Sequence, residues 1–231
     1  INIATPASPT LIGSYDAGGT ANAEGVFIQG TYAYFVRRTS SQSEFFVVNV
    51  SNPSIPTLVG SINLASDSSE IAVIGNYAYV ASSSDTQELT VISIGAPSNP
   101  TVVASLNLSG TADSLSIAGF ATTVLVGRNN GDMHIVNVGN PLAPQLVGTL
   151  NVQGAVYDID TGNSNTYAFL ATGAGSAEFR VVDISNLTSP VSLGALDLTA
   201  PIHGVAYDQT FHRAYVVGEA NASEFIVIAP Q

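Results

Sequence analysis

Apolar and polar residues alternate in short runs along most of the chain, a pattern typical of β-strands with one buried face. Gly, Asn and Ser residues separate these runs, and the same order of runs returns several times. A first strand passes through a short turn into a second strand, which often carries an aromatic-alanine pattern. A polar loop then leads to a third strand, and a linker containing proline leads to a fourth. First strands are expected around residues 26–28, 71–74, 115–118, 156–159 and 205–207.

The proline linkers fix the period of this repeat. Five similar segments contain them: PASPTLIGSYD from Pro6, PSIPTLVGSIN from Pro53, PSNPTVVASLN from Pro97, PLAPQLVGTLN from Pro141 and LTSPVSLGALD from Leu187. The second prolines, Pro9, Pro56, Pro100, Pro144 and Pro190, follow one another at intervals of 44 to 47 residues. Four antiparallel strands in about 45 residues are typical of a β-propeller blade, whereas a β-sandwich rarely keeps such a unit through five copies.

The two ends of the sequence predict how the ring closes. Ile1 and Ile228 both align with Val48, near the end of a third strand, so the sequence contains a whole number of repeats. We therefore expect residues 1–231 to form one five-bladed domain of four-stranded antiparallel blades. In this prediction, residues 10–16 supply the fourth strand of the last blade by pairing with the strand from Phe225, which closes the ring without a free edge.

The repeated sequence segments resemble those of the LVIVD-repeat proteins. The resemblance rests on VVNVSNPSIPTLVGSIN, VISIGAPSNPTVVASLN and VVDISNLTSPVSLGALD, with GNYAYVA upstream, and it covers essentially the whole chain. It implies a propeller fold and a surface or secreted protein of bacteria or archaea. The family has no general set of catalytic residues to carry over. Leu187 departs from the pattern, because the other four linkers have proline at that position.

Composition excludes several classes of function. The chain has 17 acidic residues against five basic ones, all five of them arginine, and a formal net charge of −12. Such a surface repels nucleic acid and anionic lipid, so neither is expected as a partner. The absence of cysteine rules out disulfides and thiolate zinc sites, and no apolar run is long enough to span a membrane. The absence of lysine excludes a phosphate-binding loop of the GxxxxGK type.

Acidic residues recur at one position of the repeat, directly before the third strand. They are Glu44, Glu88, Asp132, Glu178 and Glu224. On a ring they predict a circle of carboxylates that could bind Ca²⁺ or a hydroxylated ligand, since calcium prefers oxygen donors. The alternative is that each carboxylate accepts hydrogen bonds within its own blade and recurs because the blade recurs. With the loops on the same side included, 13 of the 17 acidic residues are expected on one face or its rim.

Two further positions of the repeat carry polar residues. The fourth strands end in Asp16, Asn63, Asn107, Asn151 and Asp197, whose short side chains predict Asx turns. Residues at the start of the first strands instead differ from blade to blade, and they should lie near the mouth of the central channel. Those residues are the candidate ligand site: Glu24, Glu70, Asp113 and His203. Such variation fits an asymmetric binding site and also fits a surface without function.

These observations favour a non-catalytic binding or adhesion module at the cell surface or outside the cell, which recognises a protein or a glycan through its acidic face. A structural spacer in a larger surface protein is the alternative. A glycosidase is a weaker alternative, because it would need a pair of carboxylates about 5 to 9.5 Å apart in a cleft. No cofactor is expected apart from a possible Ca²⁺, and the chain is expected to be a monomer or part of a larger polypeptide.

Overall fold

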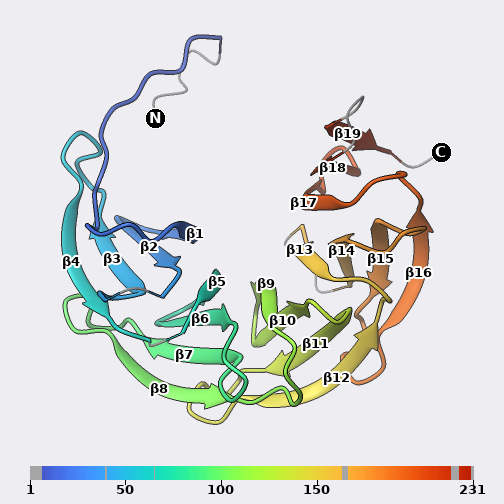
Figure 1. Ribbon diagram of the computed structural model, residues 1–231, viewed down its shortest axis with the longest axis horizontal. Helices are drawn as coiled ribbons and strands as arrows, with labels where there is room; N and C mark the ends of the chain where they lie inside the picture. The colour runs from blue at the N-terminus through green and yellow to red at the C-terminus, as the bar shows by residue number, and fades with distance from the viewer. Residues whose placement is uncertain (1–6, 40, 65, 163–165, 220–223, 230–231) are drawn as a thin grey trace.

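The computed structural model describes residues 7–39, 41–64, 66–162, 166–219 and 224–229, and these ranges contain β-strands and no helix (Figure 1). Antiparallel sheets, called blades one to five, follow one another along an open arc. Blade one contains β1 (Ala23–Gln29), β2 (Tyr32–Arg37), β3 (Phe45–Asn49) and β4 (Thr57–Ile62). Blade two contains β5 (Ser68–Ile74), β6 (Tyr77–Ser82), β7 (Leu89–Ser93) and β8 (Thr101–Leu106).

The later blades repeat this order. Blade three contains β9 (Ser114–Phe120), β10 (Thr123–Arg128), β11 (Asp132–Asn137) and β12 (Gln145–Asn151). Blade four contains β13 (Val156–Asp160), β14 (Tyr167–Thr172), β15 (Phe179–Asp183) and β16 (Val191–Leu196). Blade five contains β17 (Ile202–Asp208), β18 (Arg213–Gly218) and β19 (Phe225–Ile228). The first strand of each blade lies on the concave side of the arc, and the fourth strand, where present, lies on the convex side (Figure 1).

The repeat of the sequence is visible in the details of each sheet. In blades one to four, the pairing of the third and fourth strands shifts register at the same point, between Val47 and Val48 in blade one. The turns between first and second strands use a residue in the left-handed region, such as Gly30 (φ 60°) and Gly75 (φ 59°), where glycine costs little. The strand pattern predicted from the sequence is therefore confirmed for the described residues.

The apolar core lies in the seams between successive blades. At the seam of blades one and two, Tyr34 and Phe45 of blade one pack with Ile71 and Ile92 of blade two. Equivalent clusters join blades two and three, three and four, and four and five. Apolar burial at these four seams is the main favourable term that holds the arc together.

The closed ring predicted from the sequence is not present. Blade five has three strands in the described chain, and β19 is its edge. Residues 10–16 do not pair with β19; they lie against blade one, on the other side of a gap (Figure 1). The period of a repeat fixes how many blades form, but the angle between blades comes from packing at the seams, which the period does not record.

Candidate functional site

A polar pocket of about 440 Å³ lies at the inner ends of the blades, and all five blades contribute to it. Its lining is Glu24, Arg38, Asp67, Ser68, Ser69, Ser83, Asp113, Leu115, Tyr157 and His203. Most of these residues stand at the start of a first strand or in a loop beside it. The structure therefore brings together Glu24, Asp113 and His203, three of the four ligand-site residues predicted from the sequence.

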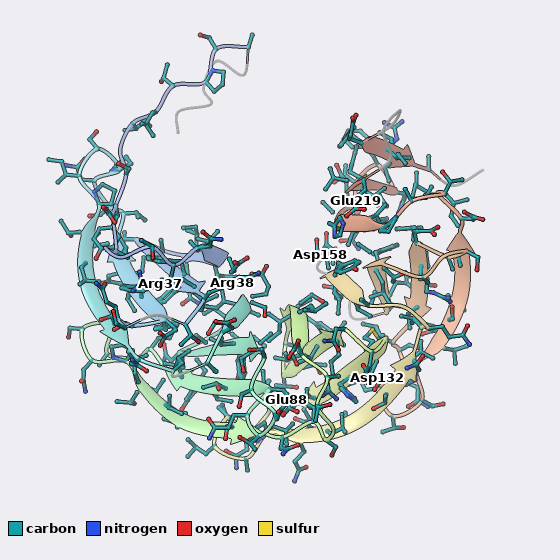
Figure 2. All side chains as sticks on the ribbon, viewed as in Figure 1. Arg37, Arg38, Glu88, Asp132, Asp158 and Glu219 are labelled. Carbon is teal, nitrogen blue, oxygen red and sulfur yellow. The ribbon has the colours of Figure 1, made fainter. Side chains whose placement is uncertain are left out.

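The loops that form the pocket meet on one side of the arc. The backbone N–H of Thr39, after β2, donates to Asp67 Oδ1, before β5, over 2.6 Å. Arg38 Nε donates to Glu24 Oε1 over 2.6 Å, so the single cation of the lining is paired with one of its three carboxylates. The hydrogen bond that Arg38 donates to Glu24 raises the pKa of Arg38. Figure 2 shows Arg38, Asp158 and Glu219 on the concave side of the arc.

The opposite wall of the pocket is aromatic. The rings of Tyr157 and His203 lie with their centroids 4.5 Å apart, tilted by 50°. His203 Nε2 lies 2.7 Å from Glu219 Oε1, so a fourth carboxylate stands directly behind the imidazole. Tyr157 occupies the same position of the repeat as Glu24 and His203, but only acidic residues and histidine at that position were predicted for the ligand site.

Blades two and three present the same Asp-Ser pair to this region. Asp67 and Asp113 occupy equivalent positions before β5 and β9, and Ser68 and Ser114 follow them. Both serines are at most 1% exposed, and their hydroxyl groups have no hydrogen-bond partner in the described structure. A buried hydroxyl without a partner is uncommon and costly, so such a group marks a place where a ligand or water can bind. Asp113 accepts a bond of 3.0 Å from Asn129 Nδ2.

Glu70, the fourth residue of the predicted ligand site, lies outside the pocket lining. Its Oε1 accepts the N–H of Ile71 over 2.9 Å, and its side chain fills the space where Gly25 of blade one has no side chain. Burial raises the pKa of Glu70 to about 7, with smaller contributions from the charges of Asp158 and Glu24. Asp158 occupies the equivalent place in blade four, where its Oδ2 accepts the N–H of Val205 over 2.8 Å. Asp158 therefore bonds the first strand of the next blade, whereas Glu70 packs against the first strand of the preceding blade.

The carboxylates before the third strands have the intrablade role that was the alternative to a metal site. Glu44, Glu88 and Glu178 are at most 2% exposed. Each accepts a backbone N–H just beyond the fourth strand of its blade: Leu64 at 2.8 Å, Leu108 at 3.0 Å and Leu198 at 2.8 Å. Asp132, which is one methylene shorter, binds the side-chain amides of Asn130 and Asn151 instead.

The structure does not gather these carboxylates at one point. Glu224, the fifth member of the series, is exposed beside β19. In the part of the chain that the structure describes, no group of three or more His, Asp or Glu side chains is placed to hold a metal ion. Among the same residues, no helix is long and apolar enough to cross a membrane.

The predicted Asx turns are confirmed at four of the five positions. The acceptor side chains and their backbone donors two residues later are Asp16 with Gly18, Asn107 with Ser109, Asn151 with Gln153 and Asp197 with Thr199, at 2.7 to 2.9 Å. The donors share a left-handed backbone, with φ between 63° and 71°. The partner two residues beyond Asn63 lies outside the described residues.

Two buried arginines support these turns, and sequence reasoning missed both. Their one signal is a shared place at the end of a second strand. Arg128 donates to the carbonyls of Ser109 (2.8 Å) and Ala112 (2.6 Å) and lies 3.4 Å from Glu88. Arg37 donates to the carbonyl of Gly18 over 2.7 Å and stacks over the ring of Phe46. Figure 2 labels Arg37 in blade one and Glu88, the ion-pair partner of Arg128, in blade two.

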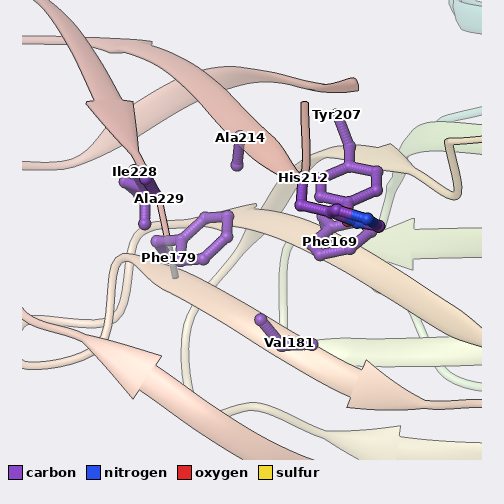
Figure 3. A pocket seen from close by; sticks show the side chains of 8 residues that line it. All are labelled: Phe169, Phe179, Val181, Tyr207, His212, Ala214, Ile228 and Ala229. Carbon is purple, nitrogen blue, oxygen red and sulfur yellow. The ribbon is translucent and has the colours of Figure 1, made fainter. Parts of the chain in front are cut away.

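An apolar pocket of about 390 Å³ opens at the outer part of the seam between blades four and five (Figure 3). Its walls include Phe169, Phe179, Tyr207 and Ile228, and the rings of Phe169 and Tyr207 stack at 3.8 Å. At the seam of blades one and two, the core cluster includes Ile94, which lies two positions beyond Ile92 of β7. In blade five that position lies outside the described residues.

Comparison with known proteins supports the fold and the family. A family model described as the LVIVD repeat matches residues 20–64, 65–107 and 163–197, more than half of the chain. No curated protein matches.

Solved structures add the fold. A protein from Lactobacillus plantarum superposes with a TM-score of 0.70 at 13% identity, covering 90% of this chain and 70% of that one. The β-propeller domain of Cps50 (Swd1) from Myceliophteria thermophila gives 0.61 at 11% identity, covering 93% and 75%. The computationally designed protein Ika8 gives 0.65 at 13% identity, and the match covers 87% of this chain but only 60% of Ika8. The chain belongs to the LVIVD-repeat family and has a β-propeller fold.

Proposed function

We propose that the chain is a non-catalytic binding module of a cell-surface or extracellular protein, and that the polar pocket at the inner ends of the blades is its recognition site. The observation that carries the proposal is the convergence of five different blades on one pocket that does not follow the symmetry of the repeat. Residues kept only for the fold recur from blade to blade, as Glu44, Glu88 and Glu178 do. One position of the repeat instead contributes a different residue to the pocket from each blade, as expected if one ligand binds at the axis: Glu24, Ser69, Leu115, Tyr157 and His203.

The charges of the pocket favour a cationic group as its ligand. Glu24, Asp67 and Asp113 line it against Arg38 alone, and Arg38 is already paired with Glu24. The face of Tyr157 adds a surface on which an ammonium or guanidinium group can stack. The hydroxyl of Ser68, which lines the pocket and has no partner, supplies a further acceptor. A lysine or arginine side chain of a partner protein has this chemistry.

A hydroxylated sugar is the second ligand class that fits, because carboxylates, serines and a tyrosine also bind glycans. Glycoside hydrolysis has less support. Burial raises the pKa of two carboxyl groups near the pocket, Glu70 and Asp158, and neither side chain lines it. The extracellular setting rests on the resemblance to LVIVD-repeat surface proteins.

Titration of the protein with short peptides tests the proposal. We expect tetralysine and tetra-arginine to bind by calorimetry, with affinity that falls as salt rises, and expect the Nε-acetylated tetralysine not to bind. Asp113→Asn should weaken binding several-fold, whereas Asp85→Asn, which removes an exposed charge outside the lining, should leave it unchanged. Equal weakening by both variants would reduce the effect to net charge. Binding of neutral oligosaccharides alone would favour a glycan, and no binding of either class would favour a structural spacer.

The proposed module is a single domain of residues 1–231 arranged as a five-bladed ring.

A further inference from the structure

Each formed seam buries the same set of side chains. The face of a blade that turns toward the next blade presents four positions from its second and third strands, which in blade one are Tyr34, Val36, Phe45 and Val47. Val36, Phe45 and Val47 are fully buried, and so are Ala81, Leu89 and Val91 at the equivalent positions of blade two. Four seams of the arc are built in this way.

Blade five presents the same face with nothing on it. Val217, Phe225 and Val227, the equivalents of Val36, Phe45 and Val47, are 47%, 60% and 49% exposed. Side chains that are completely buried in one copy of a repeat and half exposed in another indicate a missing contact, because a large exposed apolar patch marks an interaction surface.

Blade one presents the complementary face, also uncovered. Val26 and Ile28 are 65% and 58% exposed, whereas their equivalents in blade two, Ile71 and Val73, are 3% and 8% exposed. Beside them lies a hollow of about 360 Å³ whose lining includes Ala33, Phe35, Val48 and Val50, together with Gly13, Ser14 and Tyr15 of the N-terminal segment.

The N-terminal segment already lies on blade one as the fourth strand of a preceding blade would. Three contacts repeat those of true fourth strands. A side chain at Gly13 would overlap the carbonyl oxygen of Pro53, as one at Gly60 would overlap that of Pro97. Arg37 donates to the Gly18 carbonyl as Arg128 donates to that of Ser109, and Asp16 caps the same turn as Asn107. The N-terminal segment thus contacts blade one as a preceding fourth strand would, but no third strand pairs with it in the described structure.

In the described ranges, blade five has the opposite deficiency: a third strand without a fourth. The carboxylate of Glu224 is exposed, whereas Glu44, Glu88 and Glu178 hold a backbone N–H just beyond their fourth strands. The neighbouring strand β16 is exposed along its whole length, and nothing lies within 4 Å of the Cβ position at Gly194. At Gly60 and Gly148 this space holds the linker that precedes the next blade's fourth strand.

We infer that residues 10–16 form the fourth strand of blade five, pairing with β19 and closing the fifth seam between blades five and one. The segment keeps its place on blade one, and the arc closes to bring β19 to it. Alignment with β3 and β4 sets the register: Phe225 faces Tyr15, Ile226 faces Ser14 and Val227 faces Gly13. The N–H of Ala17 then stands where Leu64 stands in blade one and donates to Glu224.

A disulfide placed across this pairing tests the inference. The chain has no cysteine, so Ser14→Cys with Ile226→Cys introduces one isolated pair. The equivalent side chains in blade three, Thr149 and His134, touch at 2.8 Å, which shows that this register places the two side chains on one face. Facing residues of antiparallel strands have the Cα separation that a disulfide requires. The control is Ser14→Cys with Val227→Cys, because a shift of one residue turns the second side chain to the other face.

We expect the first pair to oxidise to a monomeric, internally cross-linked chain and the control pair to do so much more slowly. Cross-linked dimers would overturn the inference in favour of a second copy that supplies the strand. Two freely reactive thiols in a folded monomer would overturn it in favour of the open arc. Circular dichroism of the reduced variants establishes folding. If the double variant does not fold, the stability change of Gly194→Ala tests ring closure without cysteine.

Discussion

Gly194→Ala separates the closed ring from the open arc by the sign of a stability change. Gly194 lies in β16, at the position of Gly60 in β4 and Gly148 in β12. A methyl group at Gly60 or Gly148 would overlap the carbonyl oxygen of Pro97 or Leu187 in the following linker. At Gly194 the same methyl group would meet no atom within 4 Å in the open arc. In the closed ring it would meet the linker at residues 7–9, the equivalents of Ser98 to Pro100 beside Gly60.

The two states give effects of opposite sign and useful size. In a closed ring, a methyl group costs about 1–3 kcal/mol where the linker backbone is fitted to glycine, as it is at Gly60 and Gly148. The equivalent position of β8 holds Ala104, so the linker of blade three is fitted to a methyl group. In an open arc, replacing an unstrained glycine by alanine stabilises a protein by about 0.4–1 kcal/mol, because the unfolded chain loses freedom. For a chain of this size, 1 kcal/mol shifts Tm by about 2–4 °C. We therefore expect Gly194→Ala to lower Tm by several degrees, whereas the open arc requires a rise of about 1–4 °C.

Urea and thermal unfolding followed by circular dichroism measure this change, and two glycines calibrate it. Gly60→Ala should destabilise the protein in either state, because its linker is already in place. Gly175→Ala, at a turn position with no atom within 4 Å and no positive φ, should be neutral or slightly stabilising in either state. A result for Gly194→Ala that matches Gly175→Ala would refute the closed ring. A result that matches Gly60→Ala would support it.

Three further predictions concern the carboxylates. Glu88→Ala leaves Arg128 buried without its charge partner and the N–H of Leu108 without its acceptor, so it should lower the free energy of unfolding by about 3–5 kcal/mol in urea titration, whereas Asp85→Ala should change little. Glu70→Gln should stabilise the protein at pH 8 by up to about 3 kcal/mol before solvent screening is counted, and should have no effect near pH 4. The folded pKa of Glu70, about 7, lies above its unfolded value of 4.5. The native protein therefore loses stability as pH rises from 4.5 to 7, and the Glu70→Gln variant does not. Equal effects of the substitution at pH 4 and pH 8 would contradict this. Because backbone N–H groups occupy Glu44, Glu88 and Glu178, we expect chelator and added Ca²⁺ to leave the melting midpoint unchanged, and a rise with Ca²⁺ would show a site.

The sequence predicted the blades well because each strand carries its own periodicity. The linker prolines mark the start of each fourth strand, and alternation places Phe45 and Val47 on one face of β3 and Val48 on the other. Closure was not predictable in the same way. Whether the fifth seam is formed depends on the angles at four other seams, and these arise from side-chain volumes that meet only in three dimensions.

The candidate site was predicted in part, for reasons of side-chain length and burial. Recurrence marked Glu44, Glu88 and Glu178 as important, but it could not tell a surface carboxylate from one that turns inward to a backbone N–H. Glu70 was grouped with Glu24 because both stand at the start of a first strand, yet Glu70 points to the preceding blade and fills the gap at Gly25. Asp67 shares its phase with Asp113, and that shared phase is the signal that could have found it.

The pocket and the open seam are physically connected, because the two sides of the gap both line the pocket. Glu24 and Arg38 belong to blade one, and His203 belongs to blade five, whose neighbour Glu219 stands behind it. A ligand that contacts both sides binds the closed ring better than the open arc, and so must favour closure by the ratio of its two affinities. The oxidised Ser14→Cys, Ile226→Cys protein should therefore bind tetralysine more tightly than its reduced form, because the disulfide removes the free-energy cost of closing the ring. Asp113 lies in blade three, away from the seam, so Asp113→Asn should weaken both forms by the same factor. Equal affinity of the oxidised and reduced forms would show that ligand binding and ring closure are independent.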